Sequence, residues 1–262
     1  MSLIFYSSYI PSINTLFIGE DFLKTIESTF NDSIVCVGIQ KGSIPEWDII
    51  IEEYKGKGLD IHYGHINDGL YVNSDVSGFQ KALEIYCKDL NYKEFDGCVW
   101  FGHSKGVTSG NIPYHKFIMK YFWYRRDMLE KSLMFNDEIG SYSFYLSLIP
   151  EYTNSNINNI WGDYTDFKFT KKSINYMYTN TFFMCKKEPF LNVFKKIKDK
   201  FFSEKLVGVS EIGDRYFFER DFIHFIDMQN LLPSYEELAI NNVCKNPTKE
   251  KLNNEIELWK RN

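Results

Sequence analysis

Five consecutive residues combine the groups that binding of a phosphate requires. They are Gly-His-Ser-Lys-Gly, from Gly102 to Gly106, and they follow the apolar segment 96–101. The two glycines permit a tight turn and close approach of the backbone to a ligand, and the lysine supplies a compact positive charge. We interpret the segment as part of a nucleotide-phosphate site formed by His103, Ser104, Lys105 and Gly106. An ordinary turn with a surface lysine is the alternative.

The same five residues match the Gly-x-Ser-x-Gly pattern of serine hydrolases. In that interpretation Ser104 is the nucleophile and His224 is the base, because the histidine comes last along the chain in α/β-hydrolases. Two features weigh against it. The hydrolase serine leads directly into a helix, whereas Gly110 and Pro113 delay a helix here, and His224 lies within a helical pattern. A serine hydrolase or esterase is kept as an alternative.

A largely parallel sheet would position these residues. Short apolar runs alternate with helical patterns in the first part of the chain, which predicts an α/β fold with helices on both faces of the sheet. The predicted strands span 3–10, 33–40, 59–66 and 96–101, and the predicted helices span 20–30, 46–54 and 75–90. The second part is less regular, with a strand predicted over 180–186 and helices over 114–131, 188–202 and 214–227.

Further candidate ligand contacts follow from this topology, because open α/β sheets bind ligands at the carboxyl ends of their strands. Tyr9 and Pro11 follow the first predicted strand, and Gln40 and Lys41 follow the second. A nucleotide base could stack and be recognised at this edge. Asp75 begins a predicted helix, where it can cap the helix, contact the nucleotide, or do both.

The domain organisation predicted from the sequence is a single domain. No Pro-, Gly- or Ser-rich linker divides the 262 residues, so we expect one unit over 1–262. Within it, the regular front half 1–110 suits nucleotide binding. The irregular back half 111–262 suits binding of a second ligand on loops.

Four short motifs follow one another along the chain: His103-Ser104-Lys105-Gly106, Trp123-Tyr124-Arg125, Asn180-Thr181-Phe182-Phe183 and Arg215-Tyr216-Phe217-Phe218-Glu219. In this order they resemble the motifs of a family of bacterial and viral glycosyltransferases of the GT-A type. The resemblance implies a GT-A-like, Rossmann-type fold that binds the donor in the front half and the acceptor in the back half. The implied reaction transfers a sugar from a nucleoside-diphosphate sugar, with a UDP-sugar preferred, to a hydroxyl of a glycan or glycolipid in polysaccharide biosynthesis.

The resemblance also suggests roles for residues in the back half. An inverting transferase needs a carboxylate that deprotonates the acceptor hydroxyl, and Glu219 is the first candidate and Asp163 the second. For either acid, a solvated surface carboxylate is the alternative. Asn180, Thr181 and Arg125 are the candidates for binding the acceptor.

The expected metal motif of GT-A enzymes is missing from this chain. These enzymes usually bind a metal through Asp-x-Asp, and the corresponding position is occupied by His103, Ser104 and Lys105. We expect Lys105 and His103 to neutralise the leaving diphosphate, since a positioned cation stabilises developing charge with or without a metal. Binding of Mn²⁺ or Mg²⁺ is the alternative.

Composition bears on the partners of the protein. The 30 basic and 35 acidic residues give a net charge of -5, which is not the electrostatic footprint of a nucleic-acid-binding protein. Five scattered cysteines predict neither a disulfide framework nor a zinc site. Because the sequence shows no pattern of a membrane span or signal peptide, we expect a cytoplasmic protein. A non-catalytic binding protein of glycan assembly, retaining the same fold, is the alternative outside the enzymes.

Overall fold

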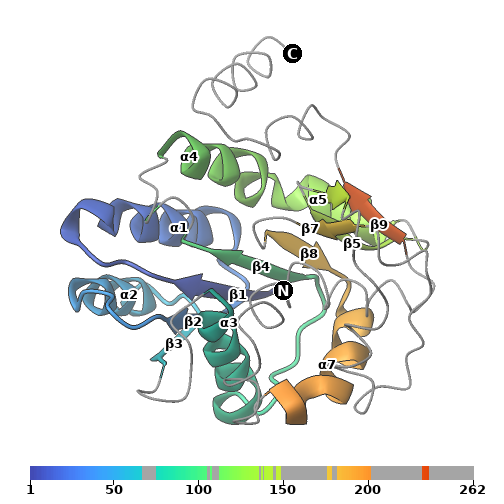
Figure 1. Cartoon of the computed structure of the whole chain (residues 1–262), viewed down its shortest axis with the longest axis horizontal. Helices are drawn as coiled ribbons and strands as arrows, with labels where there is room; N and C mark the ends of the chain where they lie inside the picture. The colour runs from blue at the N-terminus through green and yellow to red at the C-terminus, as the bar shows by residue number, and fades with distance from the viewer. Residues whose placement is uncertain are drawn as a thin grey trace.

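The computed structural model describes the front half of the chain almost completely and selected parts of the back half (Figure 1). The described residues are 1–66, 75–104, 107, 112–135, 137, 139–143, 146–148, 176–178, 182–201 and 232–235. The predicted helix over 214–227 lies outside them.

A seven-stranded sheet forms the centre of the described part of the chain, in the order β3-β2-β1-β4-β8-β5-β9. Its strands are β1 (Leu3–Ser8), β2 (Ile34–Ile39), β3 (Ile61–His65), β4 (Val99–His103), β8 (Phe183–Cys185), β5 (Ile139–Ser143) and β9 (Leu232–Tyr235). All of them run parallel to β1 except β8, which is antiparallel to both β4 and β5. A separate antiparallel pair consists of β6 (Leu146–Leu148) and β7 (Tyr176–Tyr178). The predicted α/β class and mainly parallel sheet are confirmed.

Helices cover both faces of the seven-stranded sheet, as Figure 1 shows. One face carries α1 (Leu16–Thr29), α2 (Glu46–Gly56), α4 (Ile112–Tyr121) and α5 (Arg126–Met134), and the other carries α3 (Asp75–Glu84) and α7 (Lys187–Phe201). Because successive side chains of a strand point to opposite faces, each strand supplies two cores. In β4, for example, Trp100 belongs to the core under α1 and α4, and Phe101 belongs to the core under α3 and α7.

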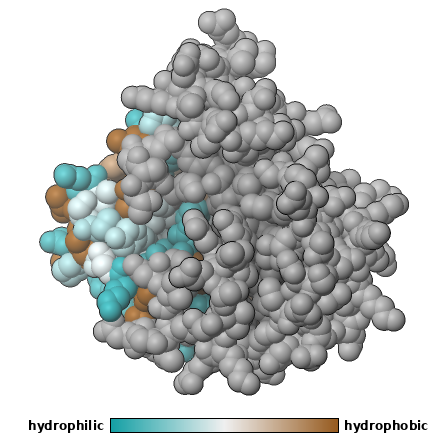
Figure 2. All heavy atoms as spheres, viewed as in Figure 1, coloured by the Kyte–Doolittle hydropathy of each residue, from teal (hydrophilic) through white to brown (hydrophobic). Residues whose placement is uncertain are grey.

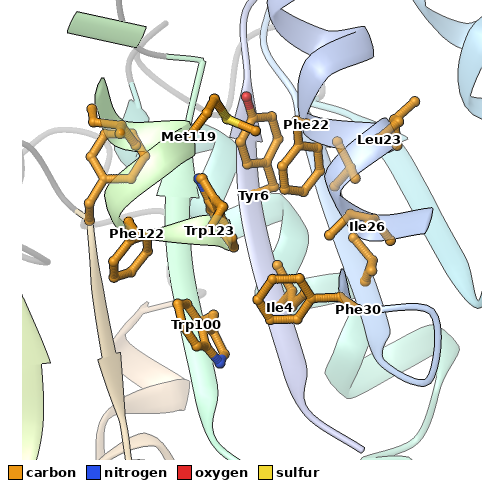
Figure 3. Close-up of a cluster of buried hydrophobic side chains, with 14 of the residues drawn as sticks. Ile4, Tyr6, Phe22, Leu23, Ile26, Phe30, Trp100, Met119, Phe122 and Trp123 are labelled. Carbon is orange, nitrogen blue, oxygen red and sulfur yellow. The ribbon is translucent and has the colours of Figure 1, made fainter. Parts of the chain in front are cut away.

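Aromatic rings fill the core under α1 and α4 (Figure 3). Trp123, in the 3-10 turn Trp123–Arg125 that follows α4, lies with its ring centroid 5.8 Å from that of Trp100 and 5.3 Å from that of Phe22. A Cβ atom on Gly102 would lie 2.3 Å from Cζ2 of Trp123. Gly102 therefore leaves the space that Trp123 occupies.

The fourth strand is longer than its apolar pattern predicts. Gly102 and His103 pair with Tyr6 and Ser7 of β1, so β4 continues to His103. The prediction that the strand ends at Phe101 is therefore wrong. This glycine is required by packing within the strand.

Several other boundaries differ from the predicted ones. The helix predicted over 75–90 becomes a π-helical turn, η2, over Ile85–Asp89, and the helix predicted over 114–131 is divided by the 3-10 turn into α4 and α5. The first helix begins at Leu16, earlier than predicted. Strands β5, β6, β7 and β9 were not predicted, because each has only three to five residues, too few for a periodic pattern to be distinct.

The surface over α1 and α2 is mixed in character. In Figure 2 the described residues on this side are largely hydrophilic, with small separate hydrophobic patches. Single exposed apolar residues of this kind, such as Ile13 and Ile49, are normal for a protein surface. Among the described helices, none has the length and apolar character that crossing a membrane requires.

Candidate functional site

The candidate site lies where the strand order of the sheet changes direction. From β1 the chain continues to β2 and β3 on one side, and from β3 it returns through α3 to β4 on the other side of β1. In open α/β sheets, ligands bind outside the carboxyl ends of the strands at such a point. Residues at the carboxyl ends of β1, β2 and β4, and at the start of α3, meet here.

A chain of polar side chains links these elements. Nδ1 of His103, at the end of β4, lies 3.0 Å from Oδ2 of Asp75, the first residue of α3. Nε2 of Gln40, directly after β2, donates to Oδ1 of Asp75 at 3.1 Å and to Oγ of Ser7 in β1 at 3.0 Å. The chain Ser7–Gln40–Asp75–His103 thus connects three strands and a helix.

The members of this chain differ in their contact with solvent. His103 is 6% exposed and Gln40 is 4% exposed, whereas the side chain of Asp75 is 46% exposed. The buried members hold the carboxylate in one orientation, and the carboxylate itself reaches the surface. An ionised carboxylate has about four acceptor positions, so it can accept several hydrogen bonds at once.

The hydroxyl of Ser104 both accepts and donates a hydrogen bond within the fold. Its Oγ accepts from N of Tyr9 at 2.7 Å and donates to O of Tyr9 at 3.1 Å, and its backbone N donates to O of Ser7 at 3.1 Å. The residue is 6% exposed. These bonds fasten the end of β4 to the segment after β1, and they weigh against Ser104 as an exposed nucleophile.

Close packing of α3 against the strands brings Asp75 to the site. A Cβ atom on Gly38 of β2 would lie 1.8 Å from O of Gly78, and one on Gly78 of α3 would lie 2.0 Å from Oγ of Ser7. Only glycine therefore permits this helix–sheet distance. Sequence reasoning missed Ser7, Gly38 and Gly78, although a glycine inside a predicted strand and another inside a predicted helix are signals of close backbone approach.

A second histidine–carboxylate pair lies on the opposite face of the sheet. Nε2 of His115 in α4 is 3.2 Å from Oδ2 of Asp21 in α1. His115 is buried, and burial lowers its pKa below the usual histidine value despite the carboxylate. Burial, with the negative charges of Asp75 and Asp21, raises the pKa of Tyr6. These residues were not predicted.

The remaining predicted residues of the front half lie around the same edge. Tyr9 is half-buried, and the Cβ position of Gly42, in the turn after β2, is 3.6 Å from its ring. Lys41 belongs to this turn and is exposed, and Pro11 is half-buried after β1. The structure therefore brings together the segments of Tyr9, Gln40, Lys41, Asp75 and His103, as the topology predicted.

Arg125, a predicted acceptor contact, lies in the 3-10 turn between α4 and α5. Nη2 of Arg125 contacts Sδ of Met128 at 3.2 Å. The next residue, Arg126, donates to O of Thr29 and to Asp32, which lie before β2 and therefore at the amino end of the sheet. The other predicted site residues lie outside the described part of the chain: Lys105, Gly106, Asp163, Asn180, Thr181 and Glu219.

Metal-binding capacity is limited in the described residues. Asp75 and His103 contact each other, and no group of three or more His, Cys, Asp or Glu side chains suited to a metal occurs among the residues that the structure describes.

Comparison with known proteins gives no family: no family model matches the sequence, and no curated protein matches it significantly.

Proposed function

We propose that the protein is a GT-A-type glycosyltransferase that binds a nucleoside-diphosphate sugar, with UDP-sugars preferred, and transfers the sugar to a hydroxyl of a glycan or glycolipid. The observation that carries the proposal is the convergence of Gln40, Asp75 and His103 at the edge where the strand order changes direction. The order β3-β2-β1-β4 also matches the first four strands in the order of doubly wound nucleotide-binding sheets. The resemblance of the four sequence motifs to those of GT-A enzymes is the reason for proposing sugar transfer.

The geometry supports a division of roles at the donor site. The ring of Tyr9 lies beside the turn after β2, where a base can stack against it. The half-exposed carboxylate of Asp75 is suited to accept a hydrogen bond from a ribose hydroxyl. His103 and Lys105 would face the diphosphate, where positive charge stabilises the leaving group. Asn180 and Thr181 would bind the acceptor, and Glu219, or Asp163, would deprotonate it.

A thermal-shift panel with UDP, GDP, CMP and dTDP tests the donor site. Saturating UDP is expected to raise Tm by about 5 °C or more, because a ligand at about 100 times its Kd adds ~2.7 kcal/mol to the stability of the folded state. Asp75→Asn is expected to weaken binding about tenfold through loss of a charged acceptor. The matched control is Asp127→Asn, which changes an exposed carboxylate on α5.

The nucleotide panel, a fluorophosphonate probe and an assay of nucleotide release together separate the candidate functions. Absence of a shift with all four nucleotides contradicts the proposal, and so does an equal effect of the two variants. Labelling of Ser104 by a fluorophosphonate probe supports the serine hydrolase. Nucleotide binding without acceptor-dependent release of nucleotide from any UDP-sugar supports the non-catalytic binding protein.

A further inference from the structure

A buried histidine joins the start of α4 to α1. His115 is the fourth residue of α4 and is 3% exposed, and its Nε2 lies 3.2 Å from Oδ2 of Asp21 in α1. The ring of Phe17, also in α1, stands nearly perpendicular to the imidazole, with 6.0 Å between the ring centroids. Because an ionised carboxylate only accepts hydrogen bonds, the neutral imidazole donates from Nε2 to Asp21. This histidine–carboxylate pair is termed the α1–α4 contact.

The surroundings of His115 favour the neutral ring. Among the described residues, the charged groups that act on it are Asp21 from α1 and Lys116 from α4. Burial lowers the pKa of His115, and the positive charge of Lys116 acts in the same direction. A position near the N-terminal end of a helix also disfavours a cation, because that end carries a partial positive charge. Asp21 opposes these effects, but the pKa of His115 stays below the usual histidine value.

We propose that the α1–α4 contact is a pH-sensitive switch and that the first turn of α4 opens when His115 takes up a proton. The proton comes from solvent and adds to Nδ1, since Nε2 already carries one. It binds more readily to an exposed imidazole than to this buried one, so acidification favours conformations in which His115 reaches water. The end of a helix opens more easily than its middle, and His115 lies near such an end. The switch does not rest on the proposed function.

The turn that opens is connected to the candidate site. The segment 105–111 joins β4 to α4 and contains Lys105 and Gly106, which are predicted phosphate contacts. On the other side of the contact, α1 follows the segment of Tyr9 and Pro11. The α1–α4 contact therefore joins the two helices that follow β1 and β4. For the proposed donor site, opening at acid pH is expected to weaken nucleotide binding.

An NMR titration of the histidine rings in the unmodified protein is the first test. We expect His115 to titrate with a pKa below the ~6.5 of a free histidine, because its ring is buried. The signal that disappears in His115→Gln identifies the residue. A pKa of His115 at or above ~6.5 overturns the proposal. This measurement requires neither a ligand nor a stable variant beyond the assignment.

The free energy of unfolding between about pH 7 and pH 5 is the second test, because an exposed histidine gains its proton in this range. When folding lowers the pKa of a histidine, the stability present above ~6.5 is lost as the pH falls. His115→Gln keeps an amide that can donate to Asp21 but does not titrate. It should therefore lose less stability on acidification than the unmodified protein. An equally steep loss in both proteins contradicts the switch.

Hydrogen exchange locates the change within the fold. After correction for the pH dependence of exchange itself, the amides of α4 should lose protection between about pH 7 and pH 5, whereas those of α2 should not. His115→Gln should keep the protection of α4. The control is His62→Gln, which changes a histidine in β3 that contacts Asp60, and it should behave as the unmodified protein does. Unchanged protection of α4 on acidification overturns the switch, and so does an equal loss in His115→Gln.

Binding of UDP separates the switch from the proposed function. In the unmodified protein, UDP should bind more weakly at about pH 5 than at about pH 7, and the difference should be smaller in His115→Gln. An equal difference in the two proteins overturns the connection between the α1–α4 contact and the candidate site. Absence of UDP binding at both pH values overturns the proposed function alone, because the other three measurements use no ligand.

Discussion

At the scale of single residues, Ser104 illustrates how a motif can serve the fold. Its hydroxyl bonds to both N and O of Tyr9, so the serine connects two strand ends on either side of the candidate site. The same residue type in the same pattern would be a nucleophile if it were exposed and paired with a base. Its position here keeps the segment of Tyr9 in place.

Ser104→Ala is therefore expected to lower the free energy of unfolding by about 1–3 kcal/mol, because it leaves N of Tyr9 without its acceptor. The measurement is urea denaturation. The control is Ser28→Ala, which removes a 3.3 Å bond within α1 and should cost less than about 0.5 kcal/mol. An effect of Ser104→Ala as small as that of the control would contradict this structural role.

At the scale of elements, the contact between α3 and the sheet determines the geometry of the site. Gly38 and Gly78 remove the side chains that would otherwise separate the helix from β1 and β2. The first residue of α3 therefore reaches Gln40 and His103. Two glycines without any polar function thus position the carboxylate.

Gly78→Ala tests this packing. The added methyl group would lie 2.0 Å from Oγ of Ser7, so α3 must move outward, and we expect a loss of about 1–3 kcal/mol in unfolding free energy. Stabilisation by UDP should fall as well, since Asp75 moves with the helix. Gly56→Ala, in α2, meets no atom within 4 Å and should be neutral or stabilising by up to about 1 kcal/mol. Equal stability of the two variants would exclude the proposed contact.

At the scale of the whole molecule, Arg126 joins distant segments at the edge opposite the candidate site. From α5 it donates to O of Thr29 at 2.8 Å, to Oδ2 of Asp32 at 3.2 Å and to Oε1 of Glu130 at 3.3 Å. Its guanidinium also lies 4.8 Å from the ring centroid of Phe30. The back half is fastened in this way to the segment between α1 and β2.

The ion pair between Arg126 and Asp32 predicts how the free energy of unfolding depends on pH. Arg126 lowers the pKa of Asp32 from its usual 3.8 to about 2. A carboxyl group whose pKa is lowered by folding stabilises the fold at pH values above its pKa in the unfolded chain. This contribution is lost as the pH falls toward its pKa in the folded protein. Asp32 is half-exposed, so solvent screening limits the contribution to about 1 kcal/mol.

Asp32→Asn should accordingly reduce the unfolding free energy by about 1 kcal/mol at pH 7, and the difference from the unmodified protein should narrow between about pH 4 and pH 2. Urea denaturation over this range measures both proteins, and Asp127→Asn serves as the exposed control. A difference that stays constant down to pH 2 would exclude the ion pair as its cause.

Local sequence patterns determined the fold class and the edge of the sheet at which the candidate site lies. The alternation of apolar runs and helical patterns predicted β1 to β4 and the intervening helices, because burial on a strand or helix follows a short period along the chain. From the order of these elements, the rule for parallel sheets placed Tyr9, Gln40, Asp75 and His103 at one edge. Both results need only neighbouring residues and a general rule of topology.

Contacts between distant segments were decided by the tertiary structure alone. The bonds of Asp75 to Gln40 and His103, and of Ser104 to Tyr9, depend on how closely α3 and the strands pack. The insertion of antiparallel β8 beside β4 depends in the same way on long-range pairing. No local pattern encodes such contacts, because complementary shape between segments far apart in sequence selects them. Gly102 shows the difference: the sequence predicted that the strand ends before it, whereas pairing with β1 continues the strand and the packing of Trp123 requires a residue without a side chain.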